Sequence, residues 1–298
     1  MPLATASDGV RIHFEEAGTG HPLIFVHEFG GDLRSWEAQV RWFARSYRCI
    51  RFNARGYPPS DVPEDEALYG HEQAADDIAA VMGALGLSRA HVVGLSMGGY
   101  ATLQFGMRHP RLASALVVAG AGSGAPRAHR VDFRAQADAL AERLLREGSP
   151  AVARDMGLSA TRVQLLEKDP LGWAEFVEQF ATHSARGSAM TLRRYQALRP
   201  SLFDHERELA ALAIPTLLVV GDEDEPCLET NLFLKRTMTA ADLWVMPGTG
   251  HAVNLEEPAA FNDGVERFLA GVDRGSWLPR DPRTIGAAPL PVGSAPVR

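Results

Sequence analysis

The sequence predicts an α/β protein with a mostly parallel sheet, helices on both faces and an inserted helical block. Short apolar runs alternate with helix-like stretches between residues 22 and 119. Such alternation is typical of parallel strands joined by crossover helices. Strand-like runs are absent from residues 123–204 and resume at residues 216–221. We therefore expect one α/β domain that is interrupted by helices.

The first strands and helices are predicted from their apolar spacing. Residues 10–16 alternate apolar and polar side chains after an Asp8-Gly9 turn, as an edge or hairpin strand does. Residues 22–27 form a continuous apolar run, which is expected of a strand buried on both faces. Helical spacing over residues 36–43 is followed by a strand pattern at residues 47–52.

The remaining elements follow the same alternation. A long amphipathic pattern over residues 71–87 predicts a helix that ends near Gly86. Three further elements complete the first half, namely a strand at 91–95, a helix at 97–108 and a strand at 115–119. Helix-like stretches occupy 133–147 and 173–184 in the inserted block. The last elements are strands at 216–221 and 243–246 and a helix at 258–272.

These patterns divide the chain into four segments. Residues 1–122 and 205–278 are expected to form the two parts of the α/β core, and residues 123–204 the helical insertion. Residues 279–298 contain five prolines and no periodicity. We expect this tail to be flexible or to lie over the surface.

Composition restricts the classes of function that we consider. The net charge is −7 and no basic block occurs, so neither nucleic acid nor an anionic membrane is an expected partner. The N-terminus lacks the pattern of a signal peptide, and no apolar run reaches the ~18 residues of a membrane span. Cys49 and Cys227 are the only cysteines, so a disulfide framework is not expected. We expect a cytoplasmic protein whose cysteines are buried or inert.

A candidate nucleophile lies between the expected strand 91–95 and the helix 97–108. The segment Gly94-Leu95-Ser96-Met97-Gly98 has the form of a nucleophile elbow, a sharp turn that holds a serine hydroxyl above the sheet. Glycine suits the two outer positions because a Cβ there would collide with the crowded backbone. A serine hydroxyl is a weak nucleophile near neutral pH and needs a histidine held by a carboxylate.

Downstream residues offer both partners in the chain order serine, acid, histidine that accompanies this elbow. His251 lies in a glycine-rich loop after the last expected strand, from which it can reach the carboxyl edge of the sheet. The strand 115–119 is followed by no carboxylate, whereas the strand 216–221 is followed by four acidic residues in a row. This leaves Asp222 and Asp224 as the candidate acids.

With these motifs, the chain resembles an α/β-hydrolase with a helical cap, over residues 8–272. The resemblance rests on the elbow, on the turn Gly221-x-x-Asp224, and on Gly250-His251 followed by Glu257-Pro258. It implies an eight-stranded, mostly parallel sheet, with residues 123–204 as the cap. In this family the acid usually lies three residues after the glycine, which favours Asp224 over Asp222.

The resemblance also implies an oxyanion hole formed by the backbone N–H groups of Phe29 and Met97. Two such donors stabilise the charged oxygen of a tetrahedral intermediate, typically by ~3 to 4 kcal/mol each. The chain departs from the family at Glu28, where glycine is common, and at Asn53, where aspartate is common and a structural role is expected. Either Glu28 points away and pairs with an arginine, or it meets a cationic substrate group or tunes His251.

The expected reaction is hydrolysis of a small or medium carboxylic ester through an acyl-enzyme. Carbon–carbon bond hydrolysis, lactone opening, perhydrolysis and acyl transfer use the same triad, and a ligand-sensing receptor with little turnover is an alternative of another class. No cofactor or metal is implied, the expected partner is a small-molecule substrate, and the oligomeric state stays open. Possible substrate-lining side chains, whose helical spacing is equally typical of a core, are Glu28, Phe176, Phe180, His183, Met190 and Tyr195.

Overall fold

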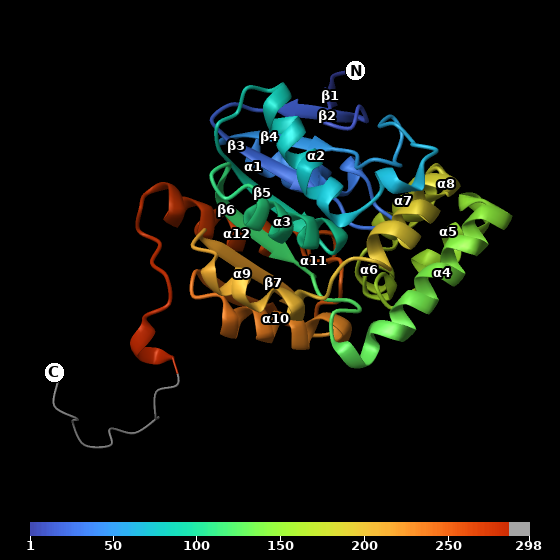
Figure 1. The fold of residues 1–298 in the computed structure, drawn as a ribbon. Coiled ribbons are helices and arrows are strands. Elements are labelled where there is room, and N and C mark those ends of the chain that lie inside the picture. Colours follow the sequence, from blue (N-terminus) through green and yellow to red (C-terminus); the bar gives the residue numbers. More distant parts are fainter. Residues whose placement is uncertain (286–298) are drawn as a thin grey trace.

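A computed structural model describes residues 1–285, and its centre is an eight-stranded sheet (Figure 1). The strand order is β1-β2-β4-β3-β5-β6-β7-β8. The β1–β2 and β2–β4 pairs are antiparallel and all other neighbours are parallel, which confirms the predicted sheet. In chain order the strands are β1 (Leu3–Thr5), β2 (Arg11–Ala17), β3 (His21–Val26), β4 (Tyr47–Phe52), β5 (Ala90–Leu95), β6 (Ala113–Ala119), β7 (Thr216–Gly221) and β8 (Ala241–Met246).

Helices cover both faces of the sheet because successive strand side chains point to opposite faces. Val92 of β5 lies in one apolar core and the next residue, Val93, lies in the other. The first core also receives side chains from α2 (His71–Ala84), α3 (Met97–Arg108), α9 (Glu206–Ala211) and α10 (Glu225–Thr237). The second receives side chains from α1 (Glu37–Phe43) and α12 (Pro258–Asp273).

The block 123–204 contains helices and no strand, as predicted. Figure 1 shows α4 to α8 gathered at one end of the sheet. These helices share a third apolar core of their own. Their bounds are α4 (Arg130–Glu147), α5 (Ser149–Gly157), α6 (Val163–Lys168), α7 (Pro170–Ala181) and α8 (Ala185–Met190), followed by a π-helical turn (Thr191–Gln196) and a 3-10 turn (Leu202–His205). The exact limits of this block as a domain remain a prediction.

Most differences from the predicted elements are small shifts at their ends. α2 ends at Ala84, and α7 begins at Pro170 because Asp169 caps it by accepting from the backbone N–H of Gly172. The three-residue strand β1 was not predicted, because it is too short to show a pattern. At the start of the expected tail, the Arg280 N–H donates to the carbonyl of Thr239. The rest of that prediction, residues 286–298, lies outside the described residues. None of the helices in residues 1–285 is both long and apolar enough to span a membrane.

We expect one buried histidine, His91, to make the stability of the sheet sensitive to pH. His91 of β5 lies 2.9 Å from Asp273 (Nε2 to Oδ1), yet burial lowers the pKa of its imidazole to about 4. The unfolded chain therefore takes up this proton near pH 6.5, before the folded protein does. We expect the free energy of unfolding to fall as the pH drops from 6.5 towards 4, by about 3 kcal/mol from this residue.

Urea unfolding at several pH values between 7 and 4 measures this loss. A His91→Gln variant should lose less stability over the same interval, because glutamine takes up no proton. Equal losses in the two proteins would contradict the assignment to His91.

Candidate active site

Ser96 occupies the sharp turn between β5 and α3. Its φ of 55° makes it the only non-glycine residue with positive φ among residues 1–285. Such a conformation costs of order 1–3 kcal/mol and is concentrated at functional sites. A Cβ on Gly94 would collide with the carbonyl of Gly98, and a Cβ on Gly98 would collide with the carbonyl of Val26. The Ser96 N–H donates to Ala119 O at 2.7 Å, which ties the turn to β6.

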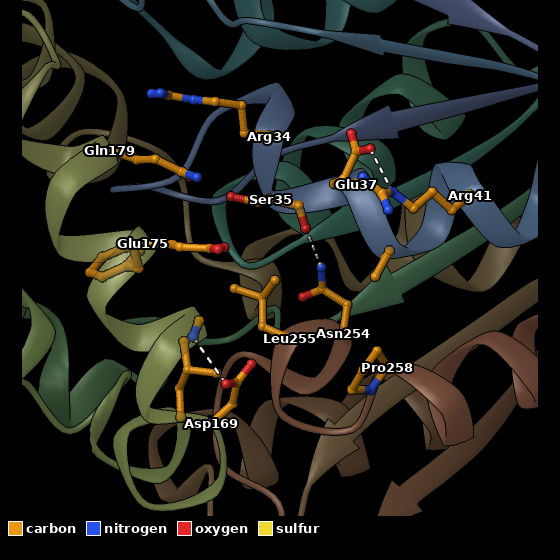
Figure 2. A pocket seen from close by; sticks show the side chains of 14 residues that line it. Arg34, Ser35, Glu37, Arg41, Asp169, Glu175, Gln179, Asn254, Leu255 and Pro258 are labelled. Atoms are coloured by element: carbon orange, nitrogen blue, oxygen red, sulfur yellow. Dashed lines mark hydrogen bonds and ion pairs between the residues drawn. The ribbon is translucent and has the colours of Figure 1, made fainter.

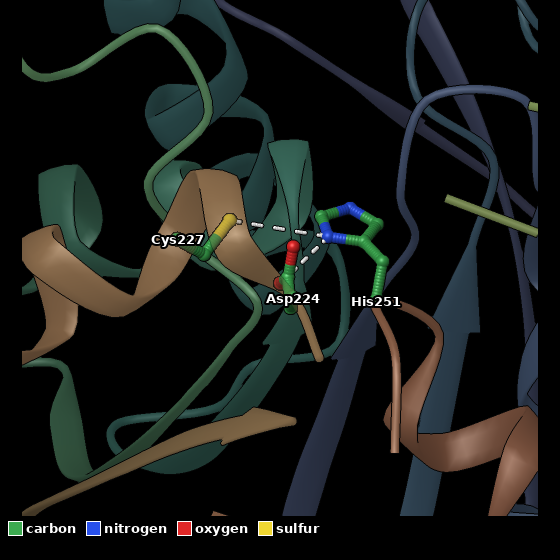
Figure 3. A group of neighbouring side chains, drawn as sticks. All are labelled: Asp224, Cys227 and His251. Carbon is green, nitrogen blue, oxygen red and sulfur yellow. Dashed lines mark hydrogen bonds and ion pairs between the residues drawn. The ribbon is translucent and has the colours of Figure 1, made fainter. Parts of the chain in front are cut away.

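The structure brings His251 and Asp224 together (Figure 3). Asp224 follows β7 and His251 follows β8, and the distance from Nδ1 to Oδ2 is 2.8 Å. Both side chains are at most 5% exposed. The carboxylate can only accept, so Nδ1 carries the proton and Nε2 can act as a base. Asp222 instead accepts from the N–H of Thr249 at 3.1 Å, which leaves Asp224 as the residue that orients His251.

Glu256 holds the loop of His251, and its role was not predicted. Its carboxylate accepts from the N–H of Gly250 at 2.6 Å and from the N–H of Ala252 at 2.9 Å. Glu256 is buried. One hydrogen bond on each side of His251 therefore fixes the backbone that carries the imidazole. In the sequence, this role is indicated only by the position of Glu256 five residues after the histidine, and that spacing alone is a weak signal.

Cys227 packs behind the acid–histidine pair. Its Sγ lies 3.9 Å from Nδ1 of His251 and donates to Gly120 O at 3.2 Å. The donor atoms of Asp224, Cys227 and His251 all lie within 4.8 Å of one another, as metal ligands can (Figure 3). However, burial raises the pKa of the Cys227 thiol, with a further contribution from Asp224. This favours the neutral thiol, which packs against the Asp224–His251 pair. Both cysteines are free and buried.

Hydrogen bonds of His27 fix the loop after β3, which carries Phe29. His27 is buried, its Nε2 accepts from the N–H of Ala54 at 3.0 Å, and its Nδ1 donates to Glu28 O at 2.8 Å. Burial lowers the pKa of this imidazole, which favours the neutral form that both bonds need. In residues 1–285, the hydrogen bonds include none donated to another backbone group by the N–H of Phe29 or Met97. In this part of the chain, a substrate oxygen would displace no backbone partner of either amide.

A cavity of about 260 Å³ contains both Ser96 and His251. Apart from these two and Phe29, its lining residues all come from the inserted block. They include two arginines, Arg162 and Arg199, that the sequence analysis did not single out. The other lining residues are Ser123, Phe133, Gln136, Ala137, Leu140, Met156, Ser159, Thr161, Leu192 and Gln196.

The structure places none of the predicted substrate-lining residues on this cavity. Phe176, Phe180 and Met190 belong to the apolar core of the inserted helices, because their helical spacing faces that core. His183 lies 3.1 Å from Asp32 (Nε2 to Oδ2). Tyr195 is buried, and its hydroxyl donates a hydrogen bond to the carbonyl oxygen of Met97 at 2.8 Å. It therefore stabilises the start of the helix that follows Ser96. Glu28 is also buried and does not line the cavity.

A larger cavity of about 360 Å³ lies elsewhere, between α1, α7 and α11 (Val253–Glu256) (Figure 2). Arg34, Glu37, Asp169 and Glu175 give it a charged rim, and Asn254 donates to the carbonyl of Ser35 at 3.0 Å. Neither Ser96 nor the acid–histidine pair lines it. Volume alone therefore does not identify the catalytic cavity.

Glu28 pairs with Arg162, which confirms the arginine hypothesis. Arg162 Nη2 lies 2.9 Å from Oε1 of Glu28, and both side chains are at most 2% exposed. Ser35 also donates to Oε1, at 3.3 Å. The carboxylate is thus turned away from the oxyanion site. Asn53 has the expected structural role, since it accepts from the N–H of Leu33 and donates to the carbonyl of Pro58.

Breaking this buried pair should destabilise the protein strongly. A Glu28→Gln variant leaves the Arg162 charge buried without its anion, and we expect a loss of about 3 to 5 kcal/mol in the free energy of unfolding. Denaturant titration measures this loss. The double variant Glu28→Gln with Arg162→Met should recover part of it. A single variant as stable as the wild type would show that the pair contributes nothing.

Comparison with known proteins agrees with this geometry. Residues 21–258 match the model of the family described as alpha/beta hydrolase fold. The 2-hydroxymuconate semialdehyde hydrolase of Pseudomonas sp. (strain CF600) is 30% identical, over 89% of this chain and 92% of that protein. The 3-oxoadipate enol-lactonase 2 of Acinetobacter baylyi is 27% identical, over 83% of this chain and 88% of that protein. Among solved structures, a thermophilic esterase from Thermogutta terrifontis has a TM-score of 0.80 at 26% identity, and the match covers 91% of this chain and 98% of that one.

Proposed function

Because this chain belongs to the α/β-hydrolase fold family, we propose that it is a serine hydrolase of small carboxylic esters. Ser96 is the nucleophile, His251 the general base and acid, and Asp224 the residue that orients and stabilises the imidazolium. The observation that carries the proposal is the shared cavity of Ser96 and His251, with Asp224 bonded to the far nitrogen of the ring.

The proposed reaction has two halves. His251 Nε2 takes the proton of Ser96 as Oγ attacks the acyl carbon, and the N–H groups of Phe29 and Met97 stabilise the oxyanion. The leaving group departs with the proton from His251, and an acyl-enzyme remains. Water, deprotonated by His251, then attacks the acyl carbon; the bond to Ser96 Oγ breaks, His251 returns the proton to Oγ, and the acid is released. The Asp224 carboxylate favours the charged imidazolium in both halves.

Two further chemistries are supported by the relatives. The names of two of them describe a semialdehyde hydrolase and an enol-lactonase. A nucleophilic serine with a histidine base also serves carbon–carbon bond hydrolysis and lactone opening. Ester hydrolysis remains our first proposal because it requires no groups other than the proposed triad and oxyanion hole.

Turnover of a graded series of 4-nitrophenyl esters, from acetate to octanoate, tests the proposal. We expect sustained release of nitrophenol with a preference for short acyl chains, because the cavity is small. A fluorophosphonate should label the enzyme on Ser96, as peptide mass mapping can establish. A protein that esters or lactones stabilise thermally without any turnover or labelling would instead be a ligand sensor.

A further inference from the structure

Arg199 places a positive charge in the catalytic cavity without an anion to balance it. Its side chain is 5% exposed and lines the cavity that holds Ser96. Nη2 donates to Ser123 O at 2.9 Å, whereas Nη1 is enclosed and has no hydrogen-bond partner among the described residues. Within residues 1–285, no carboxylate lies within ion-pair distance of this guanidinium. Burying a charge in this way is costly unless something pairs with it.

Arg162, the other arginine of the same cavity, provides the contrast. It is just as buried, but Glu28 neutralises it at 2.9 Å. Of the two arginines on the cavity wall, Arg199 is therefore the one without an anionic partner among residues 1–285.

Aromatic rings hold the Arg199 side chain in place. The guanidinium carbon lies 4.7 Å from the ring centre of Tyr100, in the first turn of the elbow helix α3, and 5.6 Å from that of Phe133. The backbone N–H of Arg199 also donates to Tyr195 O at 2.9 Å. Stacking of this kind keeps a guanidinium in one orientation. The charge is thus fixed close to the base of the nucleophile elbow.

We propose that Arg199 binds a carboxylate carried by the substrate, at the end of the acyl group away from the scissile bond. The proposal deepens, and rests on, the proposed hydrolase function. A carboxylate suits the site because its single charge matches the unpaired charge of Arg199, and its oxygens can accept from N–H groups of the guanidinium. Since Arg199 and Ser96 line the same cavity of about 260 Å³, one compact acyl group could contact both residues. The substrate class is therefore the esters or lactones of short dicarboxylic acids.

A matched pair of substrates tests this assignment. The mono-4-nitrophenyl ester of glutaric acid carries the carboxylate, and 4-nitrophenyl 5-methylhexanoate replaces its two oxygens with methyl groups. We expect the wild type to have a kcat/KM at least about tenfold higher for the glutarate ester, because a buried polar group rejects an analogue that leaves it unpaired. Arg199→Gln should remove this preference, so that the ratio of the two kcat/KM values falls to about one.

Two variants serve as controls. Arg127→Gln removes an exposed arginine from the same block and should keep the preference of the wild type. Arg199→Lys retains the charge but not the planar fork, so it should keep part of the preference; it also serves if Arg199→Gln does not fold. A wild type without the preference, or an Arg199→Gln variant that loses both activities equally, would overturn the proposal.

Binding separates this proposal from the hydrolase function. Free glutarate should raise the thermal midpoint of the wild type and of Ser96→Ala, but not that of Arg199→Gln. If neither ester is turned over and glutarate still binds through Arg199, the carboxylate site stands and the hydrolase function fails. If neutral esters are hydrolysed and glutarate binds all three proteins equally or none, the hydrolase function stands and the carboxylate site fails.

Discussion

Replacement of Ser96 by alanine should lower kcat for ester hydrolysis by about 10⁶-fold, the loss measured when other serine hydrolases lose their nucleophile. No other hydroxyl is held at an elbow within this cavity, so the acyl-enzyme cannot form elsewhere. Steady-state kinetics with 4-nitrophenyl butyrate and labelling by a fluorophosphonate measure the effect. Labelling that persists in Ser96→Ala would move the nucleophile to another residue.

A glycine variant tests whether the loss of activity comes from the missing hydroxyl or from damage to the fold. Ser96 has a φ of 55°, a conformation that glycine adopts more readily than alanine. Ser96→Gly should therefore be more stable than Ser96→Ala, by about 1 kcal/mol, and equally inactive. An active glycine variant would exclude the serine hydroxyl from the reaction. If residual activity were instead higher in the more stable of the two variants, the loss would come from damage to the fold.

Asp224→Asn should lower kcat by about 10⁴-fold, the second largest effect that we expect. An amide can donate to Nδ1 of His251, which would place the proton on Nε2 and remove the base. It also leaves the imidazolium without a counter-charge in a buried site. Burst and steady-state kinetics with 4-nitrophenyl acetate should show that acylation and deacylation are both slowed, because His251 acts as the base in each.

Asp222→Asn is the matched control, since the same change is made two residues away. Asp222 is exposed, and its contact with the Thr249 N–H needs only an acceptor, which asparagine retains. We expect less than a tenfold effect on kcat. A larger loss from Asp222→Asn than from Asp224→Asn would reassign the acid.

The parts of the site that were predictable from the sequence lie at the ends of strands. The elbow around Ser96 is a local pattern, because two glycines are needed wherever the backbone turns so sharply. Asp224 and His251 follow the neighbouring strands β7 and β8, whose carboxyl ends meet at one edge of the sheet. Their meeting at 2.8 Å follows from this topology.

The cavity wall could not be predicted in the same way. Phe176 and Phe180 have the helical spacing of a lining face, yet that face packs into the core of the inserted helices. Spacing indicates that one face of a helix is apolar but does not say which neighbour it meets. Arg199 follows the π-helical turn and carries no local signal. Its proposed role depends on the lack of a nearby carboxylate among the described residues, and this can be seen only in the folded chain.

The origin of the cavity wall has a consequence for how this enzyme could change its substrate. Phe29, Ser96 and His251 stand on loops and turns at the ends of strands, whereas all other residues that line the cavity belong to the block 123–204, which has its own apolar core. Substitutions at lining positions that make no contact with the elbow helix, such as Gln136, can therefore change the cavity wall with little effect on the alignment of Ser96 and His251. Mutagenesis libraries confined to this block should yield new specificities at an unchanged chemical step.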